Sequence, residues 1–193
     1  APDPSDSGGF NSGDVNRNQL LDTDETWTYS SSRQVTEGQY TNRVVVTGED
    51  PEGSGSVEAT DVSNHFGSTA SITLDKRTNG VLVSEPTGPL IAVDGTATFD
   101  YTIANGGNVP LEFRSLTDDN GTPGTSSDDF NPPPVENDGF NVGDTNRNDL
   151  IDTNEVWQFQ ETRTVTPGQY NNRAVGIAAD PESGTVVDDT AES

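Results

Sequence analysis

A segment of twelve residues rich in Asp, Asn and Glu occurs twice in the chain. It reads DVNRNQLLDTDE from Asp14 to Glu25 and DTNRNDLIDTNE from Asp144 to Glu155. Side-chain oxygens stand at positions one, three, five, nine and twelve of each copy, a spacing that curls a chain so that alternate residues point at one centre. Calcium takes about six to eight hard oxygen ligands in flexible geometry. Each copy is therefore a candidate Ca2+ loop.

The pattern resembles the calcium loops of EF-hand and dockerin domains. The ligand sets expected from it are Asp14, Asn16, Asn18, Leu20 (by its carbonyl), Asp22 and Glu25 in the first copy, and Asp144, Asn146, Asn148, Leu150 (by its carbonyl), Asp152 and Glu155 in the second. Two features depart from the resemblance. Position six, where glycine normally supplies a positive φ, is Gln19 or Asp149, and the residues after position twelve read as a strand instead of a helix.

The alternative for each segment is an acidic surface turn without an ion. Two copies in matching context favour calcium over that alternative. Magnesium is disfavoured, because it keeps several waters and rarely uses a cage made only of protein ligands.

A second acidic group brackets the glycine-rich stretch GTPGTSS. It consists of Asp118, Asp119, Asp128 and Asp129, and it is either another metal site or a solvated flexible loop. Asn120 begins the triplet Asn-Gly-Thr in the same stretch, which makes it a candidate glycosylation site.

The sequence around each acidic segment also repeats. Residues 9–52 align without a gap to residues 139–182. Residues 67–138 precede the second copy and contain further strand-like runs, whereas eight residues precede the first copy. This predicts a complete unit over 67–193 and the C-terminal half of another over 1–66, which needs completion by further repeats of the chain or by a neighbouring subunit.

Short β-branched and aromatic runs separated by Gly, Pro, Asn and Asp predict an all-β fold. Phe99, Tyr101 and Ile103 alternate with polar residues, which places one face of their strand inward. The fold expected is an immunoglobulin-like antiparallel β-sandwich with Greek-key connections. The strands expected in the complete unit are Ser71–Lys76, Leu90–Val93, Thr96–Ala104, Leu111–Thr117, Val156–Val165, Tyr170–Ala178 and Thr185–Asp188.

The charge of the chain limits its partners. Asp and Glu outnumber Lys and Arg by 33 to 9, for a net charge of −24. A basic patch for nucleic acid or an anionic membrane is therefore excluded, and cations are the natural partners. The chain has no cysteine for a disulfide or a thiolate metal site. No apolar run approaches the roughly 20 residues of a membrane span, which argues against direct membrane insertion.

Four stretches, SITLDKRTNG, FDYTIANGGNVPLEFRSLTDDNGTPGTSSDDF, GDTNRNDLIDTNEVWQF and GQYNNRAV, resemble in that order the DUF11 and DUF7507-like tandem repeats of large bacterial and archaeal surface proteins. The resemblance covers 67–193 and the back half of the motif in 1–66. It implies an immunoglobulin-like fold and an extracellular, cell-surface location in stalks, adhesins or fibres.

Some surface domains of this shape carry an intramolecular Lys–Asn isopeptide bond. Lys76 is the only lysine of the chain and Asn172, matched by Asn42, opens a late strand, so this pair is a candidate for such a bond. Asp100, the nearest acid considered for it, lies on the polar phase of its strand. The ordinary interpretation, a solvated lysine, is therefore favoured at this point.

The sequence features favour one of three possible functions. A calcium-stabilised structural repeat of an extracellular filament or stalk, which forms a homopolymer or continues into further repeats, is favoured. A ligand- or carbohydrate-binding adhesin module that takes glycans is the alternative, although Trp27 and Trp157 lie in phase with apolar neighbours as core residues do. An enzyme is not expected, since His65, the only histidine, has no serine or acid at a recognisable motif spacing.

Overall fold

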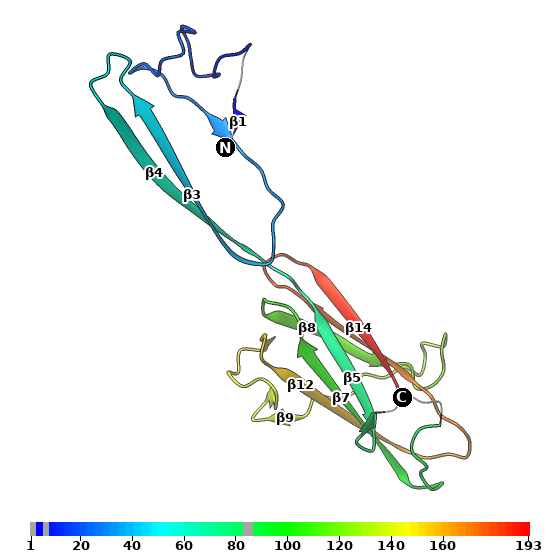
Figure 1. Ribbon diagram of the computed structural model, residues 1–193. Helices are drawn as coiled ribbons and strands as arrows, with labels where there is room; N and C mark the ends of the chain where they lie inside the picture. The colour runs from blue at the N-terminus through cyan, green and yellow to red at the C-terminus, as the bar shows by residue number, and fades with distance from the viewer. Residues whose placement is uncertain (1–2, 6–7, 83–86) are drawn as a thin grey trace. The chain divides into compact units, whose positions relative to one another are not determined.

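The computed structural model describes residues 3–5, 8–82 and 87–193 (Figure 1). Every regular element in these residues is a strand, so the all-β prediction is confirmed. The chain divides into two compact units, Ala1–Thr36 and Glu37–Ser193. The sequence predicts the division between residues 66 and 67 instead. The two divisions differ because the hairpin formed by residues 38–67 belongs to the larger unit.

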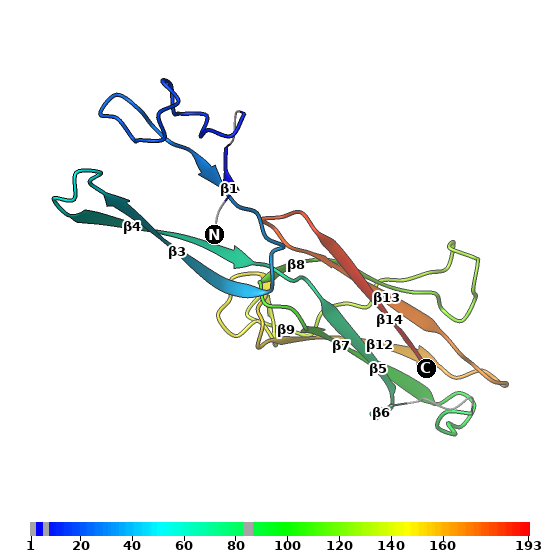
Figure 2. The ribbon, with the colours of Figure 1, turned by 45° about the horizontal axis from the view of Figure 1, so that its top comes forward.

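The larger unit contains a sandwich of two four-stranded sheets (Figures 1 and 2). Neighbouring strands within each sheet are antiparallel. The first sheet has the order β12 (Val156–Thr164), β7 (Thr96–Asn105), β5 (Ile72–Thr78) and β6 (Val81–Leu82). The second has the order β11 (Leu150–Ile151), β8 (Leu111–Asp118), β13 (Arg173–Ala179) and β14 (Val186–Glu192).

The alternation in the sequence fixes which side chains enter the core. Along β7, Phe99, Tyr101 and Ile103 are at most 2% exposed, while the residues between them are half-buried. Both sheets contribute to one apolar cluster, so the two layers share a single core. Its buried members are Ile72, Leu74, Ala97, Phe99, Tyr101, Ile103, Leu111, Leu116, Ile151, Trp157, Phe159, Ala174 and Ala178.

One predicted strand is wrong, and several short ones were not foreseen. The run Leu90–Val93 is not a strand, because it ends in a turn at Val93 and Asp94, and Asp94 has a φ of 65°. Leu90 is fully exposed. The short strands β6, β11, β9 (Glu136–Asn137) and β10 (Phe140–Asn141) were not predicted.

A long hairpin precedes the sandwich in the chain. Its strands, β3 (Gly38–Glu49) and β4 (Ser56–Gly67), pair antiparallel over their full length. Nearly every side chain in it is exposed, including Val44, Val45 and Val46 of β3. In the second copy the repeat places β13 at the position of β3, and there Ala174, Gly176 and Ala178 are buried. The residue types for an inner face are thus present in β3, and no core covers them in the described structure.

The smaller unit contains β1 (Asp3–Pro4) and β2 (Tyr29–Ser30), which pair with each other. Residues 26–34 repeat the sequence of β12, yet in the described structure only Tyr29 and Ser30 among them are in a strand. The difference is explained by the presence or absence of a neighbouring strand. β12 pairs with β7 along nine residues, and the described part of the smaller unit has no counterpart of β7.

Candidate functional site

The second acidic loop is organised around the buried carboxylate of Asp144. Its Oδ1 accepts the backbone N–H groups of Arg147 and Asn148, at 2.6 and 3.2 Å, and its Oδ2 accepts that of Asp149 at 3.0 Å. Asn146 and Asn148 donate from Nδ2 to the same Oδ2 of Asp152, at 2.6 and 3.1 Å. Positions one, three, five and nine therefore turn inward, as the spacing predicted.

Glu155, at position twelve, joins the two ends of the loop. Its Oε1 accepts the N–H and the hydroxyl of Thr145, and its Oε2 accepts the N–H of Asp152 and Nε1–H of Trp157. Burial alone raises the pKa of Glu155, but the hydrogen bonds from Thr145, Asp152 and Trp157 lower that pKa overall. The carboxylate is thus kept ionised, and its two oxygens accept hydrogen bonds from the loop and from Trp157.

The structure explains how each loop forms despite its two departures from an EF-hand loop. Position six adopts a positive φ without glycine: φ is 64° at Gln19 and 60° at Asp149. Position four does so as well, at Arg17 and Arg147. The sharp turn that glycine normally allows is therefore formed by ordinary residues at some cost in backbone strain. In the second copy, the chain after Glu155 continues directly into β12, as predicted.

The first loop has the same internal structure as the second. Asp14 accepts the N–H groups of Asn18 and Gln19, Asn16 and Asn18 both donate to Asp22, and Glu25 accepts from Val15, Asp22 and Trp27. Asp14 is as deeply buried as Asp144, at 5% exposure. Since the described residues of the smaller unit form no sandwich around this loop, the loop conformation is set locally, by its own sequence.

The two loops differ in what lies behind them. Ile151 is completely buried in the core, whereas its counterpart Leu21 is 64% exposed. Trp157 is 7% exposed and its ring lies 6.0 Å from that of Phe113, while Trp27 is half-buried. The second loop is therefore anchored in the sandwich.

Each loop brings together oxygen-bearing side chains of the type that calcium binds. Two carboxylates and two carboxamides converge in each, and the carboxamide oxygens at positions three and five each accept one backbone N–H, which leaves a lone pair free. An ion also requires the carboxamides to turn their oxygens toward Asp22 or Asp152. In the described part of the chain, no cluster of three or more His, Cys, Asp or Glu side chains is arranged to hold a metal. The amides are therefore essential to any such site.

The acidic group that brackets the GTPGTSS stretch is not assembled as expected. Asp118 faces the core and is completely buried, so it is not a ligand of a surface cation with Asp128 and Asp129. Asp119 accepts the N–H groups of Gly121 and Arg173, and Asp128 accepts from Asn120 and Thr122. The carboxylates are thus used separately, within the loop or the core, because the inward phase of β8 takes Asp118 away from the others.

Asn120, the candidate glycosylation residue, is half-buried and its carboxamide is engaged on both sides. Its Oδ1 accepts from Tyr170 and Arg163, and its Nδ2 donates to Asp128. A glycan on Nδ2 would displace the contact with Asp128.

A buried polar cluster lies between the two sheets. Nζ of Lys76 is 2.6 Å from Oδ2 of Asp118, and Nδ2 of Asn172 donates to Oδ1 of the same carboxylate at 2.6 Å. The hydroxyl of Tyr101 also donates to Oδ2, at 2.7 Å. All four side chains are at most 3% exposed. The interpretation of Lys76 as a solvated lysine is therefore wrong.

The acid of this cluster is not the one that the sequence suggested. Asp100, the acid considered earlier, faces outward and accepts a hydrogen bond from Gln160. The acid that contacts Lys76 is Asp118. A signal was present, because Lys76 continues the inward phase of Ile72 and Leu74 in β5, and Asp118 continues that of Leu116 in β8.

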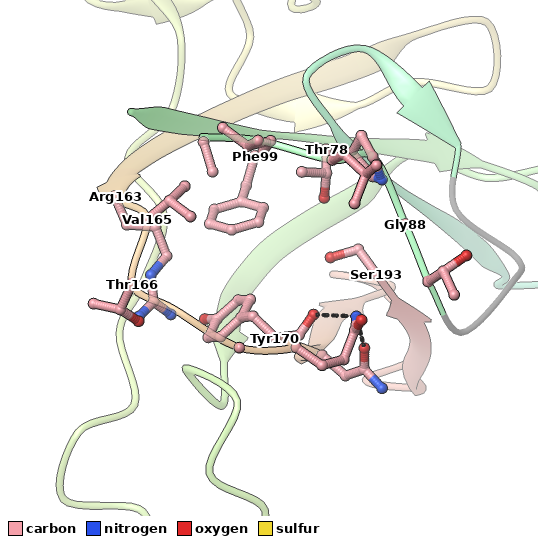
Figure 3. A pocket seen from close by; sticks show the side chains of 16 residues that line it. Thr78, Gly88, Phe99, Arg163, Val165, Thr166, Tyr170 and Ser193 are labelled. Carbon is pink, nitrogen blue, oxygen red and sulfur yellow. Dashed lines mark hydrogen bonds between the residues drawn. The ribbon is translucent and has the colours of Figure 1, made fainter. Parts of the chain in front are cut away.

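A small pocket of about 150 Å³ lies beside this cluster (Figure 3). Phe99 and Tyr170 face each other across it, with ring centroids 5.8 Å apart, and Arg163 lies 3.8 Å from the ring centroid of Tyr170. Pockets for drug-sized ligands usually enclose about 300 Å³ or more. This one is too small for an oligosaccharide.

Comparison of the chain with protein-family models, with curated proteins and with solved structures finds no match. No helix of the described residues is long and apolar enough to span a membrane.

Proposed function

We propose that the chain is a calcium-stabilised structural repeat of an extracellular filament, fibre or stalk, with an immunoglobulin-like sandwich as its building unit. One observation carries this proposal. Two loops of closely similar sequence adopt the same closed conformation and turn the carboxylates and carboxamides of matching positions inward, although their surroundings differ. A loop that folds in the same way in both surroundings is suited to a site that binds an ion in every repeat.

Calcium in such a loop stabilises the fold and has no catalytic role. The ion offsets repulsion between the two Asp carboxylates and gives the carboxamide oxygens a positive partner. The net charge of −24 makes this local neutralisation valuable for the whole chain. Extracellular calcium modules bind with dissociation constants of about 10⁻⁴–10⁻³ M, which matches calcium outside cells.

The hairpin β3–β4 supports assembly into longer structures. Three exposed valines in a row, Val44, Val45 and Val46, stand on a strand whose counterpart β13 pairs with β8 on its other edge. An exposed sheet edge with apolar side chains is a template for strand addition. We expect a strand with the chemistry of β8, from a further repeat or a second copy of the chain, to complete it.

The ligand-binding alternative has less support. Trp157 is buried in the core, and the pocket beside Tyr170 is small, so neither offers the broad aromatic platform that sugar binding uses.

Chelation of calcium tests the proposal. At tenfold excess over the dissociation constant, each site contributes about 1.4 kcal/mol, and for a unit of this size each kcal/mol raises the Tm by roughly 2–4 °C. Calorimetry of the full chain with calcium and with chelator should therefore give Tm values that differ by several degrees. Equal Tm values under the two conditions would reject a stabilising role for calcium.

A further inference from the structure

Lys76, Asp118 and Asn172 meet in the core from three different strands or their ends. Lys76 comes from β5 of one sheet, Asp118 ends β8 of the other sheet, and Asn172 directly precedes β13. We propose that Nζ of Lys76 and Cγ of Asn172 become joined by an intramolecular amide bond, with Asp118 as the catalytic acid and base. The bond covalently links the two sheets.

The position of the Asn172 carboxamide distinguishes the proposed reaction site from an ordinary buried ion pair. An ion pair between Lys76 and Asp118 needs no third polar group, and burying polar groups in a small core is costly. Yet Asn172 donates to one oxygen of Asp118 while Lys76 contacts the other. The carboxylate thus bridges the nucleophilic nitrogen and the leaving nitrogen, where a proton must pass between them.

The surroundings of Lys76 favour its neutral, nucleophilic form. Phe99 and Tyr101 each have their ring centroid 5.2 Å from Nζ, and these rings exclude water. Burial lowers the pKa of Lys76, while the charge of Asp118 acts in the opposite direction. Loss of water also protects an amide bond, once formed, from hydrolysis.

The amide of Asn172 is held for attack at its carbonyl carbon. The hydroxyl of Ser193 donates to Oδ1 of Asn172 at 2.8 Å, which draws electrons from the carbonyl and stabilises negative charge on that oxygen. The backbones of these residues exchange two hydrogen bonds of 3.0 Å, which fixes the side chains relative to each other. Ser193 is therefore a positioning and polarising residue for the reaction.

The reaction balances without an oxidant or a cofactor. Asp118 takes a proton from the ammonium of Lys76, and the freed electron pair of Nζ attacks Cγ of Asn172. Asp118 then gives its proton to Nδ2, and ammonia leaves as the C–Nδ2 bond breaks. The second proton of Nζ passes through the same carboxylate to this ammonia. The products are one C–Nζ amide bond and one ammonium ion.

The mass of the intact chain tests the proposal directly. The bond lowers the mass by one ammonia, so the folded, purified chain should be lighter than its sequence by that amount. Because Lys76 is the only lysine, any lysine-to-amide bond must use it. An unshifted mass would overturn the proposal.

Loss of ammonia can also arise by cyclisation at an Asn–Gly pair such as Asn79–Gly80, so the linkage must be mapped. A linked Lys76 resists trypsin, and digestion should yield one branched peptide in which residues 44–77 are joined to residues 164–173. Fragmentation should place the branch on Asn172. Loss of ammonia without this branched peptide would also overturn the proposal.

Three variants assign the roles. Asn172→Ala and Asp118→Asn should have no ammonia loss, whereas Asn42→Ala, at the matching exposed position of the first repeat, should retain the loss in full. A fully linked Asp118→Asn chain would refute Asp118 as the catalyst. If either core variant fails to fold, the mass and peptide map of the unmodified chain still decide whether the bond exists.

Discussion

Lys76 and Asp118 form an ion pair of 2.6 Å in which neither side chain is accessible to solvent. The pair joins opposite sheets of the sandwich, since Lys76 belongs to the sheet of β5 and Asp118 to the sheet of β8. In a chain with a thin apolar core, this contact connects the two layers where leucine or isoleucine would otherwise pack. It accounts for the position of the only lysine in a chain of net charge −24.

The ion pair gives the first prediction. Asp118→Ala should lower the free energy of unfolding by roughly 3–5 kcal/mol, because it leaves a buried lysine without its partner. Loss of the proposed bond would add to this, since a cross-link that closes a loop of about 100 residues contributes roughly 4.7 kcal/mol in the chain-entropy account. Urea unfolding measures the change. Asp100→Ala, which removes an outward carboxylate, is the control and should stay within about 0.5 kcal/mol. Equal effects of the two changes would contradict the assigned burial.

The anchoring of the second loop gives a matched pair of variants. Ile151→Ala should destabilise the larger unit by roughly 2–5 kcal/mol, because the side chain is fully buried in the core. Leu21→Ala, at the same position of the first loop, removes an exposed side chain and should change stability by less than about 0.5 kcal/mol. Thermal unfolding of both variants makes the comparison. A large loss from Leu21→Ala would show that the first loop is covered after all.

A turn between β13 and β14 gives a pH prediction. The hydroxyl of Ser183 donates to Oδ2 of Asp180, and the backbone N–H of Glu182 donates to Oδ1. These bonds hold the pKa of Asp180 below its ordinary value of 3.8, more than burial raises it. A carboxyl group with a lowered folded pKa stabilises the fold above pH 3.8, and this contribution is lost as the pH falls through the folded pKa.

Asp180→Asn tests the turn. The variant should be less stable than the unmodified chain at neutral pH, and the difference should shrink as acid protonates Asp180. Chemical unfolding at several pH values between neutrality and pH 3 measures it. A difference that is constant over this range would exclude the carboxylate as its source.

The bare hairpin gives a prediction about dynamics. Backbone amides of β3 and β4 should exchange with solvent many-fold faster than those of β13 and β14, because among the described residues no core covers the hairpin and each of its strands pairs only with the other. Hydrogen exchange followed by mass spectrometry on the full chain compares the two pairs. Equal protection of both pairs would mean that the hairpin is already completed, for example by association of chains, which sedimentation at several concentrations would reveal.

Much of the fold could be predicted from local alternation. Phe99, Tyr101 and Ile103 marked the inner face of β7, and the structure buries all three. Leu90–Val93 has the apolar composition of a strand, but a turn with positive φ at Asp94 ends the run and no strand of the described residues pairs with it. Alternation reports which face of a strand is apolar, and it does not report whether a neighbour is present.

The candidate site was only partly predictable. The loop conformation follows from its own twelve residues, which explains why both copies close alike. The cluster of Lys76, Asp118 and Asn172 depends instead on the packing of two sheets. Phase along β5 and β8 indicated that Lys76 and Asp118 face inward, but their meeting requires the register of strands that are far apart in sequence. For this reason the sequence alone groups Asp118 with the acidic residues of a metal site or a flexible loop.

Calcium stoichiometry tests the proposed function most directly. Calorimetric titration of the chelator-treated full chain should show two calcium ions bound per chain, and Asp14→Ala and Asp144→Ala should each remove one. Both substitutions delete the buried carboxylate that organises a loop. Two sites, each abolished by its own substitution, are the predicted result. A chain that binds no calcium at extracellular concentrations would contradict the account of this protein as a calcium-stabilised repeat.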